Sequence, residues 1–236
     1  MTRVVISQPM YFPWVGFMEQ MLLADVFIWL DEVQYVKKSF TNRVQVKQKM
    51  GVSWITIPLV GGGNRQPISS LRASGDHWMF KHRKTILNSF NGYTHADRAI
   101  SVFDAMWANN NSLCDQLIAG TELQAREIGC LPKTVLKSSE MGIFARSSER
   151  LLKLTQAVGG TDYVTGHGAA QYLNHSIFDD AKIDVSYMQY NPRPWPQNHG
   201  EFTPFVTGLD LLASTGRSAA SHLRPTTRSW KHFIVK

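Results

Sequence analysis

Short apolar runs alternate with longer amphipathic stretches along most of the chain. Val4–Ser7 and Val26–Leu30 are typical of buried strands, and between them apolar residues recur at helical spacing from Gly16 onward. The opening stretch, Val4–Arg43, therefore predicts two parallel strands joined by a helix. The carboxyl ends of such strands share one edge of the sheet, where ligands bind in parallel α/β folds.

The same alternation continues after this unit. Two alternating runs joined at Met50-Gly51 predict a β-hairpin, and residues 96–128 carry helical stripes that end at Gly129. The other predicted elements are strands at Ile68–Leu71, Thr134–Leu136, Asp162–Gly166 and Ile183–Val185, and helices from Asp76, at Ser147–Val158, around Ala169–Leu173 and from Leu209 to near Gly216. This order indicates an α/β fold with a mainly parallel, Rossmann-like sheet, helices on both faces and a helical C-terminal portion.

The pattern also predicts the domain organisation. Residues 1–216 are expected to form a single α/β domain whose middle segment, about 76–128, is mostly helical. Three prolines in Pro192–Pro196 predict a stiff, extended loop. Residues 217–236 are polar and basic, which is typical of a loosely ordered tail.

Composition narrows the class of protein. No apolar run among the 236 residues approaches the roughly 20 that cross a bilayer, and no apolar signal segment follows a charged start. Cys114 and Cys130 are the two cysteines, so no disulfide framework is expected. The eight histidines show no HxxxH or HExxH spacing, so no metal site is predicted. We expect a cytoplasmic protein without membrane contact, and these patterns do not specify its oligomeric state.

The formal net charge of +7 indicates attraction to phosphates. Basic residues gather in Lys81–Lys84 and again after Arg217, although no nucleic-acid-binding motif is visible. The loop Gly61–Arg65 lacks the Lys-Ser/Thr of a phosphate-binding P-loop. No cofactor is required by the sequence; ATP or another nucleotide is compatible with it, and tRNA remains an alternative partner.

Polar and aromatic side chains follow the two opening strands, and such residues are unusual in a loop unless they hold a ligand. We predict that they line one cleft at the edge of the sheet. Asn42 and Arg43 suit a carboxylate or phosphate, because a guanidinium binds such groups with two hydrogen bonds. Core packing is the alternative for the aromatic members. The predicted substrate-binding residues here are Gln8, Tyr11, Trp14, Gln34, Asn42, Arg43 and Trp54.

Two titratable residues are candidates for catalysis within reach of this cleft. His82 is the leading general base, since histidine suits acid–base chemistry near neutral pH. Its alternative role is a surface position on a basic helix. Asp31, at the end of the second strand, would orient a histidine or hold a substrate amine, and its alternative role is that of an ordinary loop acid.

The proline-rich loop offers a second set of polar groups. We predict that Trp195–Phe202 folds back over the same cleft, with Gln197 or His199 touching the substrate. The alternative is a surface connection to the helix that follows.

Several motifs carry a resemblance to a known family. QPMYFPWVGF, ADVFIWLDEVQY, SFTNR and WITIPL resemble the signature of the WbqC-like family, and DYVTGHGAAQYL, PQNHGEFTPF and GLDLLASTG extend the resemblance along most of the chain. Members occur in O-antigen and natural-product gene clusters. The resemblance implies a biosynthetic enzyme that forms or rearranges an amide, ester or C–N bond on an amino-acid- or sugar-derived small molecule, with an acyl or aminoacyl donor. His167 stands where the family usually has a proline, so it is either a catalytic group or a neutral turn substitution.

The segment MYFPWVGF is also similar, more distantly, to the HxGH nucleotidylyltransferases and pantothenate synthetases. Gly16 is kept, while Trp14 and Phe17 stand where the two histidines would be. Those histidines stabilise phosphoryl charge, which Trp and Phe cannot do. This resemblance implies a shared fold without adenylyl transfer by the usual groups. It leaves two alternatives open: a nucleotide- or substrate-binding accessory protein, or a tRNA-dependent aminoacyl transferase.

Overall fold

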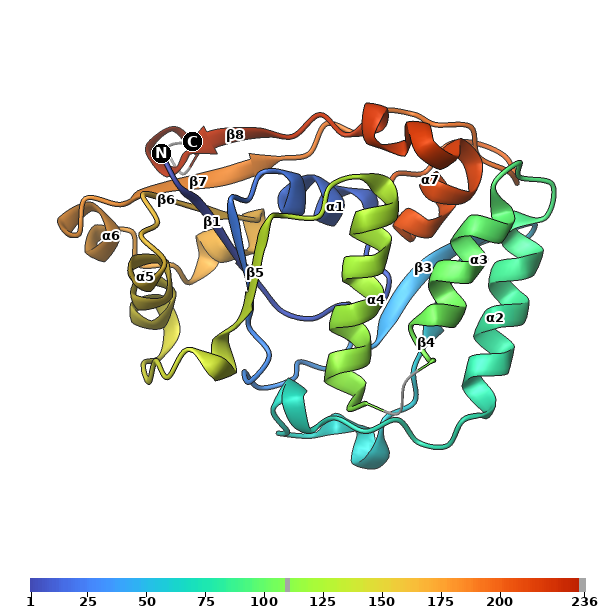
Figure 1. Ribbon diagram of the computed structural model, residues 1–236, viewed down its shortest axis with the longest axis horizontal. Coiled ribbons are helices and arrows are strands. Elements are labelled where there is room, and N and C mark those ends of the chain that lie inside the picture. The colour runs from blue at the N-terminus through green and yellow to red at the C-terminus, as the bar shows by residue number, and fades with distance from the viewer. Residues whose placement is uncertain (109–110, 234–236) are drawn as a thin grey trace.

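The computed structural model describes residues 1–108 and 111–233. One sheet contains the strands β1 (Arg3–Ser7), β2 (Val26–Trp29), β5 (Thr134–Lys137), β6 (Asp162–Thr165), β7 (Asp184–Gln189) and β8 (Thr226–Ser229). Their order is β5-β2-β1-β6-β7-β8 (Figure 1). The first five run parallel, and β8 pairs antiparallel with β7 at one edge. The mainly parallel sheet expected from the sequence is confirmed.

The opening unit folds as predicted. β1 and β2 are parallel neighbours with Val4 opposite Val26, and helix α1 (Val15–Leu22) connects them. Side chains alternate between the two faces of the sheet, because successive residues of a strand point in opposite directions. Val5 therefore belongs to one hydrophobic core and Val4 to the other.

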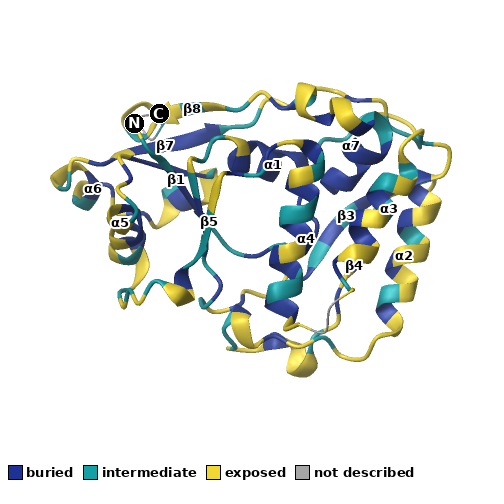
Figure 2. Cartoon of the chain, viewed as in Figure 1, coloured by how far each residue is buried: buried dark blue, intermediate teal, exposed yellow. Residues whose placement is uncertain are grey.

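Helices cover both faces, which confirms a three-layer arrangement. The core containing Val5 also holds apolar residues of α1, α4 (Leu113–Ile128) and α7 (Gly208–Thr215). The core containing Val4 is closed by α5 (Ser147–Ala157), α6 (Ser176–Asp180) and α8 (Trp230–Phe233). Figure 2 shows buried and exposed residues mixed along α4 and α5, as expected for helices that pack on one side and face solvent on the other.

A second group of elements extends the first core away from the sheet. The antiparallel hairpin β3 (Arg43–Gln48) and β4 (Gly51–Thr56) packs with α2 (His77–Phe90) and α3 (Ala96–Ala105) (Figure 1). We call this group the hairpin region. The remaining short 3-10 helices are η1 (Val60–Gly63), η2 (Ile68–Ser70), η3 (Ser138–Glu140), η4 (His167–Gln171) and η5 (Gly216–His222). No helix of the described residues has the length and apolar character needed to cross a membrane.

The strand order produces a switch point beside β1. From β1 the chain moves to β2 and β5 on one side, and it later returns to β6 and β7 on the other. Connections that leave in opposite directions open a crevice at the carboxyl ends of the two central strands, here β1 and β6.

Three segments differ from the prediction. Ile68–Leu71 is not a strand but the 3-10 turn η2, held by backbone bonds from Ile68 to Val33 and from Ser69 to Asp31. The helix expected around residues 169–173 is the 3-10 helix η4. Residues 217–229 are not a loose tail, because they form η5 and the edge strand β8, whereas residues 234–236 of that stretch lie outside the described residues. The sequence of β8 is Thr-Thr-Arg-Ser, which lacks the apolar alternation that would predict a strand.

Candidate functional site

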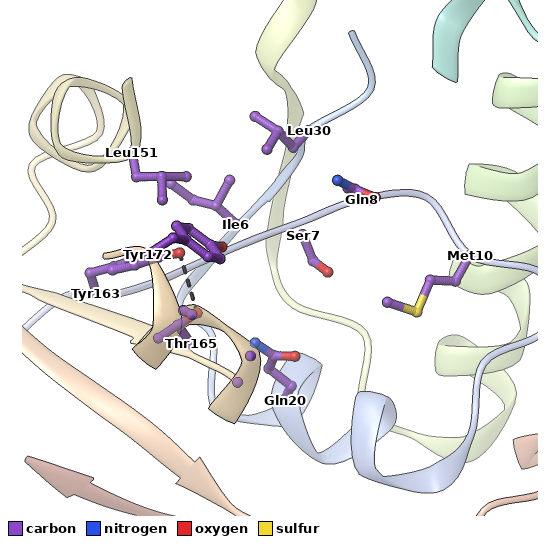
Figure 3. A pocket seen from close by; sticks show the side chains of 13 residues that line it. Ile6, Ser7, Gln8, Met10, Gln20, Leu30, Leu151, Tyr163, Thr165 and Tyr172 are labelled. Atoms are coloured by element: carbon purple, nitrogen blue, oxygen red, sulfur yellow. Dashed lines mark hydrogen bonds between the residues drawn. The ribbon is translucent and has the colours of Figure 1, made fainter. Parts of the chain in front are cut away.

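A cavity of about 360 Å³ lies at the carboxyl ends of β1 and β6, at the switch point (Figure 3). We call it the switch-point cavity. β1 and the following loop contribute Ser7 and Gln8, α1 contributes Gln20, and β6 contributes Thr165. The other lining residues are Ile6, Met10, Leu30, Leu151, Tyr163, Gly166, Gly168, Ala169 and Tyr172. This edge is where the sequence predicted a ligand site.

Three polar side chains of the switch-point cavity are free to bind a ligand. Within the described part of the chain, Ser7, Gln8 and Gln20 form no side-chain hydrogen bond. Gln20 as a whole is only 9% exposed, and it lines this cavity. Figure 3 shows Gln8 and Gln20 bordering the same open space, with Tyr163 and Tyr172 on its other side.

The lining carries no charge. None of the described residues around this cavity is Asp, Glu, Lys, Arg or His. Burial raises the pKa of the Tyr163 phenol well above its usual value, so Tyr163 stays neutral and its hydroxyl donates to Thr165 Oγ1 at 3.4 Å. The cavity thus offers hydroxyl and amide groups beside apolar walls, a combination suited to a neutral polar molecule.

His167 borders the cavity without lining it. It lies between two lining residues, Gly166 and Gly168, at the start of η4. Its Nε2 is 3.4 Å from the side-chain amide of Gln189, and its ring centroid is 4.8 Å from that of Phe233. These contacts hold an exposed imidazole against Gln189 and Phe233, while the glycines on either side of His167 line the cavity.

His82 lies elsewhere, sealed inside the hairpin region. Its Nδ1 is 3.0 Å from the Tyr11 hydroxyl, and both side chains are buried. The rings of Tyr11 and Trp78 pack around it. Burial lowers the pKa of His82 to about 4, with a smaller opposing effect from a hydrogen bond to the Thr56 backbone. At neutral pH, His82 is therefore an uncharged link between α2, the hairpin and the loop after β1.

Asp31 connects the ends of two strands. One carboxylate oxygen accepts from the Ser138 hydroxyl and the Ser139 backbone N–H, each at 3.1 Å, and the other accepts from the Ser139 hydroxyl at 2.6 Å. These three bonds join the end of β2 to η3, which follows β5. No histidine is among these partners.

The other residues predicted after β2 are held within the hairpin region. Asn42 donates to the Ile57 carbonyl and accepts from the Tyr35 hydroxyl, each at 2.8 Å. The Arg43 guanidinium lies 4.0 Å from the Trp54 ring centroid, and Arg43 also donates to the Lys38 carbonyl. Gln34 is exposed and forms a backbone bridge with Pro67.

Trp14 packs at the start of α1. Its ring meets Tyr190 edge-on at 4.8 Å and approaches Phe205 at 5.6 Å. A Cβ atom on Gly16 would lie 2.3 Å from the Trp14 ring, so only glycine leaves room for this ring. Trp14 thereby fixes the first turn of the helix that carries Gln20.

The proline-rich loop covers the hairpin region instead of the switch-point cavity. The ammonium of Lys47, a β3 residue that is 4% exposed, donates to Gln197 Oε1 at 3.2 Å and to the Gly200 carbonyl at 3.0 Å. It also donates to the Glu201 carbonyl. His199 Nε2 is 3.2 Å from the Ser89 carbonyl, and His199 lines a separate cavity between the hairpin turn and the end of α2.

A buried carboxylate completes this attachment. Asp210 in α7 accepts from Trp195 Nε1 at 2.7 Å and from the Tyr93 hydroxyl at 3.2 Å, and the same hydroxyl accepts from the Asn198 backbone N–H. Burial raises the pKa of Asp210 to about 6. We call Lys47, Tyr93, Trp195, Gln197 and Asp210 the loop clasp.

The switch-point cavity does not bring all of the predicted residues together. Gln8 lines the switch-point cavity and His167 borders it, whereas Tyr11, Trp14, Asp31, Gln34, Asn42, Arg43, Trp54, His82, Gln197 and His199 are not among its lining residues. Whether any of these side chains contacts a substrate stays a prediction. Gln20 is not among the predicted residues; the signal for it is a polar pair, Glu19 and Gln20, within a mostly apolar first helix. Ser7 and Thr165, the polar residues that end two strands, are not among the predicted residues either.

Comparisons with known proteins agree along most of the chain. The model of the WbqC-like protein family matches residues 8–222. The uncharacterized protein Rv1507c of Mycobacterium tuberculosis is 30% identical over 230 residues, which cover 95% of this chain and 98% of that protein. No solved structure matches the chain. The matched region contains the loop after β1, the turn after β6 and the loop clasp, and the chain belongs to the WbqC-like protein family.

Proposed function

We propose that this protein is a biosynthetic transferase that forms an amide, ester or C–N bond on an amino-acid- or sugar-derived small molecule, in a pathway of the natural-product or O-antigen type. The observation that supports this most is the switch-point cavity, whose Ser7, Gln8 and Gln20 side chains have no partner among the described residues. Amides that border a cavity without a partner in the chain can bind a ligand that supplies their hydrogen bonds.

The lining indicates which part of the reaction would occur there. Neutral hydroxyl and amide groups suit an acceptor molecule with hydroxyl, amide or amine groups. The amides of Gln8 and Gln20 can also donate to the oxygen that becomes negative during acyl transfer. Among the described residues next to the cavity, His167 is the group best suited to take a proton from the attacking amine or hydroxyl.

Ligand-observed NMR with a panel of amino acids, amino sugars and their N-acyl derivatives tests the binding site. We expect a neutral polar hit whose affinity falls at least about tenfold, or about 1.4 kcal/mol, in Gln8→Ala and Gln20→Ala. His77→Gln is the control, because His77 is exposed on α2 in the hairpin region. Equal binding of the hit by all four proteins would place its site elsewhere.

Once a hit is turned over, His167→Gln tests the proton-transfer role. We expect kcat to fall roughly 10²-fold or more with little change in KM, because a general base acts on the transition state. The pH dependence of kcat should also flatten. An unchanged kcat would make His167 the neutral turn substitution.

A further inference from the structure

A second cavity, of about 670 Å³, adjoins the switch-point cavity and shares Tyr172 with it. It lies between the start of α5 and the segment that follows η4. Tyr172 is 60% exposed, so its ring is accessible to a ligand in either cavity. A ligand that occupied both cavities would pass across this ring.

The two cavities differ in charge. The second one is lined by Arg146, Lys153 and Glu149, whereas the lining of the first has no charged member. Lys153 and Glu149 form an ion pair at 2.8 Å and largely neutralise each other. Arg146 has no ion pair among the described residues, so its guanidinium can bind an oxyanion with two hydrogen bonds.

The walls that carry these groups are fastened together. The Ser148 hydroxyl, at the start of α5, accepts from the Asn174 backbone N–H at 2.9 Å. Ser147 has φ of 48°, in the left-handed region that non-glycine residues rarely adopt. This turn holds the backbone of Arg146 beside the segment that carries Tyr172. The backbone that carries Arg146 therefore requires little ordering when a ligand binds.

We propose that the second cavity binds the phosphate-bearing leaving group of an activated acyl donor, while the switch-point cavity holds the acceptor. This inference rests on the proposed acyl transfer. Forming an amide or ester from a free carboxylate is unfavourable in water, and adenylates and coenzyme A thioesters, the common activated donors, carry phosphate. Arg146 would bind that phosphate, and Tyr172 would pack between the donor and the acceptor.

The reaction balances without any further reactant. The acceptor nitrogen or oxygen attacks the acyl carbon, and a C–N or C–O bond forms as the bond from that carbon to the leaving group breaks. The leaving group keeps the electron pair of the broken bond. The proton released by the acceptor passes through His167 to the leaving group or to solvent.

Calorimetric titration of the full chain with AMP, coenzyme A and adenosine tests the donor site. We expect AMP and coenzyme A to bind at least tenfold more tightly than adenosine, which lacks phosphate. Arg146→Gln should weaken both phosphate compounds about tenfold, and Lys153→Gln should weaken them less because Glu149 already pairs with Lys153. Arg217→Gln removes the same charge from an exposed site outside both cavities and should change affinity less than twofold.

Three results would overturn the inference: no binding of AMP or coenzyme A at millimolar concentration, equal affinity for AMP and adenosine, or equal losses in Arg146→Gln and Arg217→Gln. The last result would indicate general attraction to a basic surface. If AMP and coenzyme A do not bind while Gln20→Ala still weakens binding of the neutral hit, the proposal of a donor site is wrong and the proposed function stands. If Gln20→Ala has no effect while Arg146→Gln weakens AMP, the acyl-transfer proposal is wrong and a phosphate site remains.

Discussion

The switch-point cavity and the loop clasp contain similar polar side chains in opposite states. In the clasp, Lys47, Gln197 and Asp210 each bond to other parts of the chain. In the cavity, Gln8 and Gln20 bond to nothing among the described residues. A buried polar group that is bonded within the chain stabilises one arrangement of the chain, whereas a polar group that borders a cavity without a partner retains its capacity to bind a ligand. The comparison separates the polar residues that build this protein from those that can serve its chemistry.

Replacing Lys47 is the strongest test of whether the loop clasp stabilises the fold. Replacing it by Met keeps most of the side-chain volume but leaves Gln197 and two loop carbonyls without their shared donor. We expect Lys47→Met to lower the free energy of unfolding by about 3 kcal/mol, measured by urea denaturation. Lys49→Met is the matched control on the exposed hairpin turn and should change it by less than about 0.5 kcal/mol. Similar small effects in both variants would mean that the clasp does not stabilise the loop.

His82 gives the second largest expected effect, as a change with pH. Its pKa is about 4 in the folded protein and ordinarily 6.5, so its contribution to stability is present above pH 6.5 and is lost as the pH falls towards 4. At pH 4 the free energy of unfolding should be about 3 kcal/mol lower than at neutral pH because of His82. In His82→Gln, this part of the pH dependence should be absent from urea unfolding between pH 4 and 7. His77→Gln, on the exposed face of the same helix, should keep the wild-type slope.

Asp210 should give a slope of the opposite sign in the same range. Its pKa is about 6 when folded and 3.8 ordinarily, so its contribution is present below pH 3.8 and is lost as the pH rises through 6. Asp210→Asn keeps an oxygen for Trp195 Nε1 while removing the titration. Between pH 4 and pH 7, the free energy of unfolding of the variant should rise by about 2 kcal/mol relative to that of the wild type. A constant difference across that range would contradict the buried-carboxylate interpretation.

The contrast between these regions also explains what the sequence could predict. The parallel pair of β1 and β2 is predicted correctly from the runs Val4–Ser7 and Val26–Leu30. A strand that is buried on both faces of a sheet has a continuous apolar run, which the sequence shows directly. The edge strand β8 and the turn η2 depend on pairing with distant backbone, which local patterns do not record. The sequence predicts Asp31, His82 and Gln197 as site residues from their chemistry and their place along the chain. Their hydrogen-bond partners, up to 150 residues away in the case of Gln197 and Lys47, show that they also connect distant parts of the fold.

The smallest expected effect on stability comes from comparing Gln20 with Gln124. The Gln20 amide borders the switch-point cavity and has no hydrogen-bond partner among the described residues, whereas Gln124 in α4 donates to the Pro13 carbonyl at 2.8 Å. Replacing an amide that has no partner in the chain by an apolar group of similar size breaks no hydrogen bond of the fold, while replacing the Gln124 amide leaves the Pro13 carbonyl without its donor. Gln20→Leu should therefore change the free energy of unfolding by less than about 0.5 kcal/mol, and Gln124→Leu should lower it by about 1 kcal/mol.

The same pair of variants separates stability from binding. Gln20→Leu should lose the neutral ligand found by NMR, while Gln124→Leu should retain it at temperatures where it is folded. A protein that keeps its stability but no longer binds is the result expected when a residue is kept for its ligand. If Gln20→Leu is destabilised as much as Gln124→Leu, then Gln20 supports the fold, and the division between the cavity and the clasp does not hold at this residue.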